Sequence, residues 1–199
     1  MVLMLQSRLR APVNRLITPI CNWAISLGVT ANGVSVAGAL GASGAALFFY
    51  PRGDLFVGTL IVAVFILSDL FDGTIARLSN SGGTKWGAFL DSTLDRTSDA
   101  AICIGLWLYL NDKNDPNALL CLVVLFFGGL IPYLRARAEA LGVACSVGIA
   151  ERAERLIIFL VGTGIAGLGV PVALTLTLWI LAVLSLVTIA QRIAVVYRA

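Results

Sequence analysis

The sequence has no histidine, and charged residues make up only 13% of its 199 positions. Without histidine the commonest metal-binding side chain is missing, so we expect no zinc site. The four cysteines are scattered through mostly apolar stretches and are expected to be small buried side chains rather than disulfides or metal ligands: Cys21, Cys103, Cys121 and Cys145. The net charge of +3 is small and its basic residues are dispersed, so we expect no nucleic-acid partner.

Apolar residues are abundant instead, at 59% of the chain with a mean hydropathy of +0.95, which is typical of an integral membrane protein. Polar or Gly/Pro-containing breaks divide the chain after its N-terminal arm into apolar runs that we predict to span a bilayer. There are six such runs, at about 33–50, 55–78, 85–110, 117–141, 153–168 and 172–195. The prediction is an all-α integral membrane protein with six transmembrane helices, forming one domain over 1–199 with its helix bundle at 33–195.

Residues 1–28 differ from the apolar runs because arginines interrupt their apolar positions. Arg8, Arg10 and Arg15 argue against a cleaved signal peptide. The apolar residues between them recur at nearly helical spacing, which predicts an amphipathic helix lying in the membrane interface, broken near Pro12 or Pro19. A loose cytosolic arm is the alternative.

The distribution of basic residues predicts the orientation in the membrane. If the N-terminus faces the cytosol, twelve of the 14 lysines and arginines belong to the inner side and only Arg52 and Lys113 face out. This bias follows the positive-inside rule. We therefore expect a multi-pass protein of the cell membrane whose N- and C-termini are both cytoplasmic.

Four aspartates stand out at the end of the second run and the start of the third. Asp69 and Asp72 are three residues apart, and Asp91 and Asp95 are four apart, so each pair shares one face of a helix. The polar segment 78–85 predicts a tight reversal between the two helices. At about 1.5 Å per residue, both pairs lie roughly 8–16 Å from this reversal. Antiparallel packing is therefore expected to bring the four carboxylates together near the cytosolic face.

Carboxylates gathered in a membrane protein need a cation or raised pKa values. Oxygen-only ligands suit Mg²⁺ or Mn²⁺, which usually bind together with substrate phosphates. Gly73 and Gly87 leave room beside the carboxylates, and Arg77 lies one turn beyond Gly73, where it can pair with a phosphate. The alternative is a set of salt bridges with Arg77, Lys85 and Arg96, which is less consistent with the functional role usual for charges in membranes.

The stretch resembles the signature of the CDP-alcohol phosphotransferases, Asp-x2-Asp-Gly-x2-Ala-Arg, a gap, then Gly-x3-Asp-x3-Asp. Eight positions match it: Asp69, Asp72, Gly73, Ala76, Arg77, Gly87, Asp91 and Asp95. The resemblance implies that Asp69, Asp72 and Asp91 are the main metal ligands, with Asp95 near a second ion. We assign Asp95 as the general base, because it lies one turn from Asp91 on the same face.

The first run opens with Asn32, Gly33, Val34 and Ser35, where the family often has a Pro-Asn-x-x-Thr-like start that helps to hold the cytidine nucleotide. Ala31 replaces the proline and Ser35 replaces the threonine while keeping a hydroxyl. A simple helix N-cap by Asn32 or Thr30 is the alternative. Thr84 is either an N-cap of the third run or, by resemblance, another neighbour of the nucleotide.

A second concentration of charge follows the fourth run and contains Arg135, Arg137, Arg152 and Arg155. Arginine clusters bind phosphate through paired hydrogen bonds, which predicts a pocket for a phosphorylated acceptor. An ion-paired cap that anchors lipid headgroups is the alternative. The pattern Arg-Ala-Arg-Ala-Glu-Ala, then Glu-Arg-x-Glu-Arg-Leu, is similar to the actinobacterial phosphatidylinositol-phosphate synthases, although Arg135 stands where lysine is expected.

The resemblance implies a phospholipid-synthesising transferase. It would move the phosphatidyl group of CDP-diacylglycerol to inositol 1-phosphate, releasing CMP, and would pair as a homodimer through its membrane helices. Glycerol 3-phosphate is an alternative acceptor, giving phosphatidylglycerophosphate. A cation- or proton-coupled transporter with midplane carboxylates, or a non-catalytic scaffold, would be of a different class.

Overall fold

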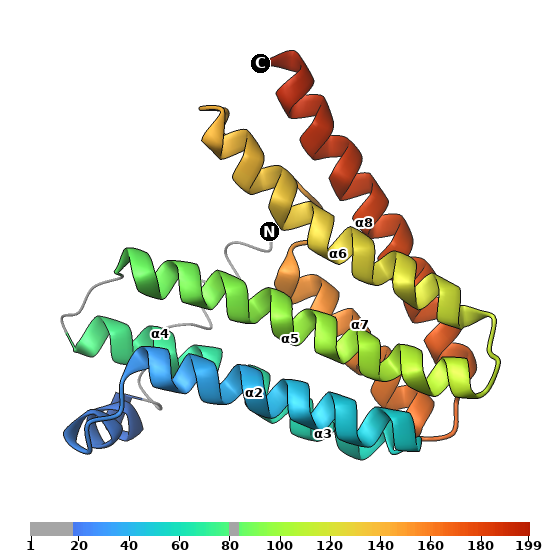
Figure 1. Cartoon of the computed structure of the whole chain (residues 1–199), viewed down its shortest axis with the longest axis horizontal. Helices are drawn as coiled ribbons and strands as arrows, with labels where there is room; N and C mark the ends of the chain where they lie inside the picture. Colours follow the sequence, from blue (N-terminus) through green and yellow to red (C-terminus); the bar gives the residue numbers. More distant parts are fainter. Residues whose placement is uncertain (1–17, 80–83) are drawn as a thin grey trace.

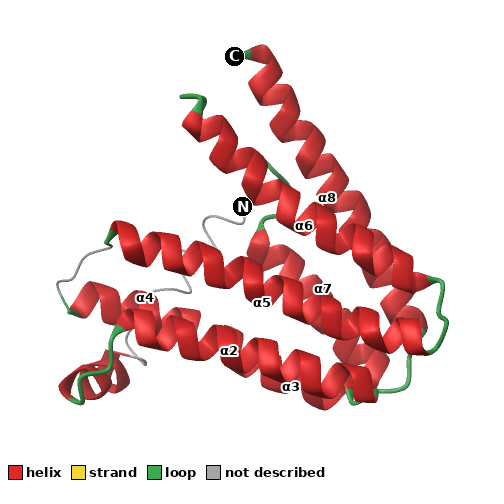
Figure 2. Cartoon of the chain, in the orientation of Figure 1, coloured by secondary structure: helices red, strands yellow, loops and turns green. Residues whose placement is uncertain are grey.

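The computed structural model describes residues 18–79 and 84–199, and every regular element in these ranges is a helix (Figure 2). A short helix over 18–26 precedes the labelled elements of Figure 1. These are α2 (Ala31–Phe49), η1 (Tyr50–Arg52), α3 (Leu55–Ile66), α4 (Asp69–Leu78), α5 (Lys85–Asp112), α6 (Asn117–Ala140), α7 (Arg152–Gly167) and α8 (Val172–Arg198). The all-α prediction is thus confirmed for these ranges, whereas most of the predicted N-terminal arm and the tip of the reversal, 1–17 and 80–83, lie outside them.

Four helical segments among the described residues are long and apolar enough to cross a membrane: Ala31–Arg52, Leu55–Leu78, Asn117–Ala140 and Val172–Arg198. The remaining two predicted spans are helical but different in character. α5 carries several charged residues in its first half, and α7 has only 16 residues. The structure is therefore that of a membrane-type helical protein, and the total of six spans stays a prediction.

The second predicted run is not one uninterrupted helix, because α3 ends at Ile66 and α4 begins at Asp69. The hydroxyl of Ser68 donates a hydrogen bond to the carbonyl oxygen of Phe65 (2.6 Å) at this junction. Ser68 also faces α2, where a Cβ on Gly38 would lie only 2.0 Å from its Oγ. The junction therefore sits tightly against α2, and the aspartates of α4 begin immediately after it.

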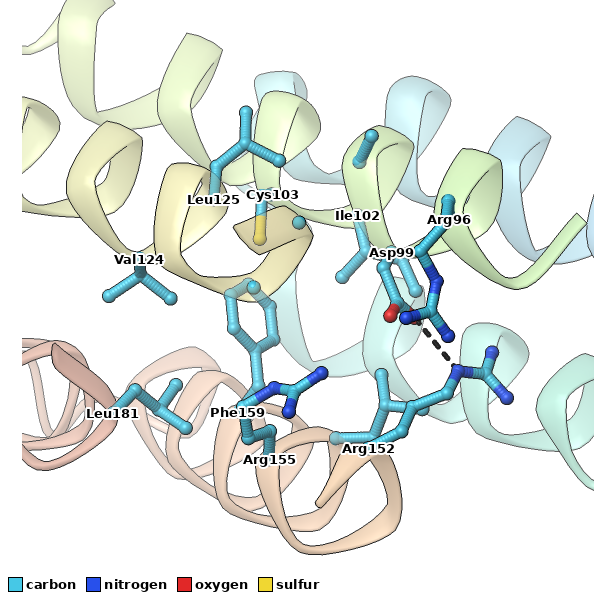
Figure 3. A pocket seen from close by; sticks show the side chains of 14 residues that line it. Arg96, Asp99, Ile102, Cys103, Val124, Leu125, Arg152, Arg155, Phe159 and Leu181 are labelled. Carbon is cyan, nitrogen blue, oxygen red and sulfur yellow. Dashed lines mark hydrogen bonds and ion pairs between the residues drawn. The ribbon is translucent and has the colours of Figure 1, made fainter. Parts of the chain in front are cut away.

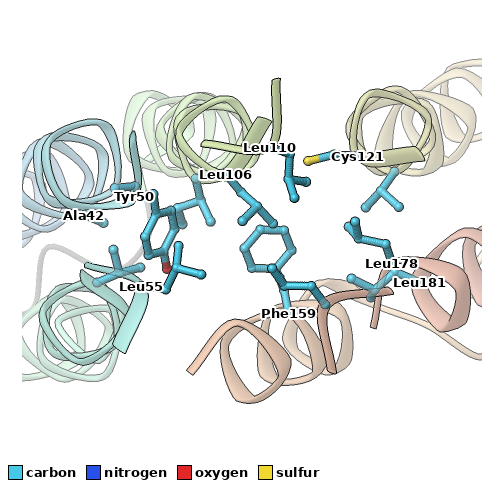
Figure 4. Close-up of a cluster of buried hydrophobic side chains, with 14 of the residues drawn as sticks. Ala42, Tyr50, Leu55, Leu106, Leu110, Cys121, Phe159, Leu178 and Leu181 are labelled. Carbon is cyan, nitrogen blue, oxygen red and sulfur yellow. The ribbon is translucent and has the colours of Figure 1, made fainter. Parts of the chain in front are cut away.

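α2 is the central element of the half that contains the aspartates, since it packs against α3, α4 and α5 (Figure 1). Gly105 of α5 permits this contact, because a Cβ there would lie 2.5 Å from the carbonyl oxygen of Ala46. The apolar core fills the far part of the bundle, around Tyr50, Leu106 and Phe159 (Figure 4). The starts of α2 and α5 lie away from this core, so polar side chains can gather there.

Candidate functional site

The starts of α2 and α5 and the length of α4 surround a cavity of about 540 Å³. We call it the carboxylate cavity, because Asp72 and Asp91 lie on its walls. The other residues lining it are Val29, Thr30, Ala31, Asn32, Ser35, Gly73, Ile75, Ala76, Ser79, Thr84, Gly87 and Ala88. Polar groups from three helices therefore share one space, on the side of the bundle that the apolar core leaves open.

The expected route to this site, direct antiparallel packing of the two aspartate-bearing helices, differs from the structure. The principal contacts of α4 and of α5 are with α2, and the carboxylate cavity lies between the two helices. The reason is that α2 provides the packing surface for both. The site is thus a cavity between α4 and α5, large enough to admit a substrate group.

Asp72 is the most enclosed of the described signature carboxylates, with only 7% of its surface exposed. The hydroxyl of Ser35 donates to its Oδ2 at 2.5 Å, so Ser35 holds this carboxylate from the facing helix. Asp91 is exposed and lines the same cavity. Asp95 and Asp91 both border a narrower space beyond it, together with Ser35 and Arg152. Asp69 begins α4, but its side chain is not described.

Two helix N-termini face the carboxylate cavity, and a threonine caps each of them. Thr30 accepts a hydrogen bond from the amide of Gly33 (3.1 Å), and Thr84 accepts one from the amide of Gly87 (3.0 Å). The two caps are neighbours, since a Cβ on Gly87 would lie 3.3 Å from Oδ1 of Asn32. Helix N-termini favour anions because their first amides are unpaired and the helix dipole is positive there.

The structure brings most, but not all, of the predicted nucleotide-binding residues to this cavity. Asn32, Ser35, Gly73 and Thr84 line it, whereas Gly33, Val34 and Arg77 are not among its lining residues. Arg77 is exposed and its Nη2 donates to the hydroxyl of Thr74 (3.0 Å).

Ile75 and Ser79 also line the carboxylate cavity, beside the signature residue Ala76, although the sequence had not marked them as candidates. They follow Asp72 at helical spacing on α4, so the same face of the helix could have identified them.

A second cavity, of about 130 Å³, lies between α5, α6, α7 and α8 (Figure 3). We call it the arginine cavity, because Arg96, Arg152 and Arg155 gather with Asp99 at one end of it. Apolar side chains line the rest: Ile102, Cys103, Val124, Leu125, Leu156, Phe159 and Leu181. Two of the predicted acceptor residues, Arg152 and Arg155, are thus brought together.

Arg152 connects the arginine cavity to the signature aspartates. Its Nη1 lies 2.8 Å from Oδ1 of Asp95, and its Nε lies 3.3 Å from Oδ1 of Asp99. Arg96 also pairs with Asp95, at 3.4 Å. Asp95 is therefore flanked by two guanidinium groups, and any ligand in the arginine cavity lies next to the proposed reaction centre.

The other two predicted acceptor arginines do not line the arginine cavity. Arg135 is exposed and pairs with Glu139 one turn further along α6 (2.9 Å). Arg137 borders a separate, mainly apolar groove of about 280 Å³ between the last turns of α6 and α8. The four arginines therefore do not converge on one cavity.

Arg192 of α8 is a buried arginine that sequence analysis did not single out, and only 3% of it is exposed. Its Nε donates to the carbonyl oxygen of Val147 (3.0 Å) and its Nη1 to that of Ile131. Arg155 similarly donates to the carbonyl oxygen of Ala150 (2.9 Å). These two arginines hold the connection between α6 and α7 against the bundle. The position of Arg192 within the apolar sequence of α8 was the feature that could have drawn attention to it.

The donor set of the site suits a hard cation, because the signature offers only carboxylate oxygens. Among the described side chains, which do not include that of Asp69, no three potential ligands lie close enough together to hold one ion. Asp72 nevertheless shows a fitting environment, since it is a buried carboxylate turned toward a polar cavity that Asp91 also lines. The residues present therefore fit a divalent metal ion shared with a bound phosphate.

Comparison with curated proteins gives relatives along nearly the whole chain. The phosphatidylinositol phosphate synthase of Streptomyces avermitilis is 45% identical over 206 residues, covering 98% of this chain and 83% of its own length. The phosphatidylinositol phosphate synthase of Mycobacterium tuberculosis is 39% identical over 195 residues, covering 96% of this chain and 89% of its own.

The chain is also similar to solved structures of such a synthase. The crystal structure of the Mycobacterium tuberculosis phosphatidylinositol phosphate synthase with CDP-diacylglycerol bound has a TM-score of 0.86 and 38% identity, over 92% of this chain and 94% of that one. The same enzyme in complex with manganese and citrate has a TM-score of 0.84 and 38% identity, over 90% and 88% of the two chains. The family model for CDP-alcohol phosphatidyltransferases matches residues 28–197, the region that holds both cavities. The chain therefore belongs to the CDP-alcohol phosphatidyltransferase family.

Proposed function

We propose that this protein transfers the phosphatidyl group of CDP-diacylglycerol to inositol 1-phosphate, producing phosphatidylinositol phosphate and CMP. The observation that carries the proposal is the adjacency of the two cavities. Asp91 and Asp95 border the narrow space between them, and Arg152 borders both that space and the arginine cavity. A donor held by carboxylates and helix N-termini can thus meet a phosphorylated acceptor held by arginines. The names of the relatives support the same pair of substrates.

The nucleotide end of CDP-diacylglycerol belongs in the carboxylate cavity. Its phosphates would face the N-termini of α2 and α5, whose capping threonines leave further amides for an anion. Asn32, Ser35, Gly73 and Thr84 line this cavity, and Gly33, Val34 and Arg77 flank it in sequence. Because Gly73 has no side chain, a phosphate can approach the backbone of α4 closely.

A divalent cation, Mg²⁺ or Mn²⁺, would be held by Asp69, Asp72, Asp91 and Asp95. Manganese in a solved relative supports this assignment. When bound, the ion would neutralise the pyrophosphate and stabilise the oxygens that enter and leave. The role of this chain is to keep Asp72 ready for the ion, with Ser35 fixing one of its oxygens.

Asp95 is the proposed general base. It accepts the proton of an inositol hydroxyl while that oxygen attacks the β-phosphorus of CDP-diacylglycerol, and the bond to CMP breaks. Arg152 and Arg96 pair with this carboxylate at 2.8 Å and 3.4 Å and fix its position between the two cavities. Arg152 and Arg155 would hold the phosphate of the acceptor, whereas Arg135 and Arg137 lie outside the arginine cavity. Glycerol 3-phosphate carries the same phosphate and is the alternative acceptor.

The protein is further proposed to be a six-span homodimer in the cell membrane, with its active site and both termini facing the cytosol. Four of the six predicted spans are supported by helical segments long and apolar enough to cross a membrane, and the orientation rests on the bias of the basic residues in the sequence. A transporter is a weaker proposal, because the relatives that match nearly the whole chain are phosphatidylinositol phosphate synthases.

The decisive experiment is an acceptor screen with the purified protein, CDP-diacylglycerol and Mg²⁺, with CMP release as the readout. Inositol 1-phosphate should support release, and free inositol and serine should not. Glycerol 3-phosphate as the better acceptor would replace the proposed product with phosphatidylglycerophosphate. No CMP release with any acceptor would argue against a transferase.

A further inference from the structure

The arginine cavity contains unused hydrogen-bonding groups of both kinds. Among the described residues, Nε of Arg96 is buried without a partner. The only hydrogen bond that the Arg155 side chain makes there comes from its Nη1, although 91% of this residue is buried (9% exposed). Asp99 uses Oδ1 for Arg152, at the long distance of 3.3 Å, and no hydrogen bond reaches its Oδ2. Buried polar groups without partners are costly, so the arginine groups point to a ligand that supplies acceptors, and the half-buried Asp99 beside them is open to a donor from the same ligand.

The combination of groups narrows the chemistry of that ligand. Arg96, Arg152 and Arg155 outnumber Asp95 and Asp99 in this cluster, so an anion is favoured overall. A bare phosphate, however, would be repelled by the carboxylate of Asp99. The arginines require an anionic acceptor, and Asp99 requires a donor. A ligand with phosphate oxygens for the guanidinium groups and hydroxyl groups for the carboxylate satisfies both requirements.

The backbone of α6 adds a further acceptor on the opposite wall. Pro132 lies inside α6 and has no N–H, so the carbonyl oxygen of Gly128 lacks its helical hydrogen bond. Gly128 and Gly129 both line the arginine cavity, and a Cβ on either would meet nothing within 4 Å. The cavity therefore has Asp99 on its α5 wall and, on its α6 wall, a glycine whose backbone a ligand ring can approach closely.

We infer that Asp99 is a specificity-determining residue that accepts hydrogen bonds from the hydroxyls of a polyol phosphate bound in the arginine cavity (Figure 3). The inference rests on the proposed function and adds to it the group that distinguishes a ring polyol from a plain phosphate or a shorter alcohol. A site built to hydrogen-bond a hydroxyl discriminates against ligands that lack it, and the half-buried carboxylate of Asp99 (23% exposed) is such an acceptor. The apolar wall around Phe159 suits the C–H edge of such a ring.

The test compares Asp99→Asn with the wild type in two measurements: the KM for inositol 1-phosphate and the inhibition constant of inorganic phosphate against it. Loss of the charged acceptor should raise the KM at least about tenfold. The inhibition constant should stay the same or fall, because phosphate uses only the arginines and loses a repulsive neighbour. Asp112→Asn, an exposed change at the far end of α5, is the matched control and should alter neither value.

A structural role predicts a different result. If Asp99 only holds Arg152 in place, the KM and the inhibition constant will rise together, and that result, like no change in either, overturns the inference. Asp99→Glu keeps the acceptor oxygens and should recover most of the affinity, while thermal stabilisation by CDP-diacylglycerol checks that each variant is folded. Failure of the wild type to use inositol 1-phosphate would remove the proposed acceptor itself, and with it this inference, before any variant is compared.

Discussion

The carboxylate cavity and the arginine cavity are built from opposite chemistry on neighbouring parts of one bundle. The first is roomy, lies at the starts of α2 and α5, and contains acidic side chains that attract a cation. The second is smaller, lies between α5, α6, α7 and α8, and has an excess of guanidinium groups beside an apolar wall. One site therefore needs a positive ion to accept a phosphate, whereas the other accepts a phosphate directly.

The difference indicates how two anionic substrates can meet without repelling one another. Each phosphate has its own neutralising groups, and Arg152 stands at the boundary, paired with Asp95 on one side and Asp99 on the other. Because α5 carries Asp91, Asp95 and Asp99 on successive turns, this helix contributes to both cavities. Substitutions in the two cavities should therefore have different kinetic effects, and the predictions below test that separation.

The largest effect is expected from Asp72→Asn, which removes the buried carboxylate of the carboxylate cavity. Turnover should fall by about 10⁴-fold or more, because metal stabilisation and positioning of the pyrophosphate are lost together. CMP release measured with Mg²⁺, with Mn²⁺ and after EDTA would check this, and the variant should still insert in membranes. Activity in EDTA equal to that in Mg²⁺ would end the metal assignment.

Asp95→Asn should have the next largest effect, because Asp95 lies at the boundary between the cavities. Losing a general base should lower kcat by about 10²- to 10³-fold. Binding of CDP-diacylglycerol, measured by thermal stabilisation or a fluorescent analogue, should change little. A loss of binding as complete as that of Asp72→Asn would make Asp95 an indispensable metal ligand and place the base elsewhere.

Arg155→Ala tests the arginine cavity, because Arg155 lines this cavity and not the carboxylate cavity. The KM for the acceptor should rise by about tenfold to a hundredfold, because one charge-assisted contact to phosphate is worth roughly 1.5–3 kcal/mol. The KM for CDP-diacylglycerol should stay within about threefold, and Arg155→Lys should be affected less, since it keeps the charge.

The control for Arg155→Ala is Arg198→Ala, an exposed change in the last turn of α8 that removes an equal charge. If the arginines merely anchor lipid headgroups, both substrates should be affected together and the effect should follow the charge of the membrane. That outcome would contradict the separation between the two cavities.

The sequence predicted features that are local to one helix and missed those that depend on which helices meet. The beginning of α5 after Thr84 and the shared face of Asp91 and Asp95 follow from capping preferences and helical spacing, and the structure places α5 accordingly. The packing of both α4 and α5 against α2 could not be predicted, because apolar runs of similar composition do not specify their neighbours. The close approach of Gly38 to Ser68, at the junction of α3 and α4, is likewise a property of the packed pair that the sequence does not specify.

The sequence likewise could not predict which of the arginines would share a cavity. Arg135, Arg137, Arg152 and Arg155 looked equivalent as a charge cluster, yet only the last two line the arginine cavity. Arg152, at the start of α7, pairs with aspartates of α5. Arg135 and Arg137, near the end of α6, lie outside the arginine cavity. Asp99 was missed because it falls outside the signature, although it lies one turn after Asp95 on the same helix face.

The smallest effect is expected from Thr84→Ala, which tests whether the rim of the carboxylate cavity is structural or binds substrate. The Thr84 hydroxyl caps α5 through the amide of Gly87 at 3.0 Å, and losing such a cap costs about 1 kcal/mol. The midpoint of thermal unfolding should fall by roughly 2–4 °C, with the KM for CDP-diacylglycerol within about threefold. Thr84→Ser should behave as the wild type, and Thr30→Ala should match Thr84→Ala, since it removes the same cap from α2. A tenfold rise in the KM for CDP-diacylglycerol without loss of stability would show instead that Thr84 binds the nucleotide. A helix cap stabilises the fold whether or not CDP-diacylglycerol is bound, so its loss must lower the unfolding temperature.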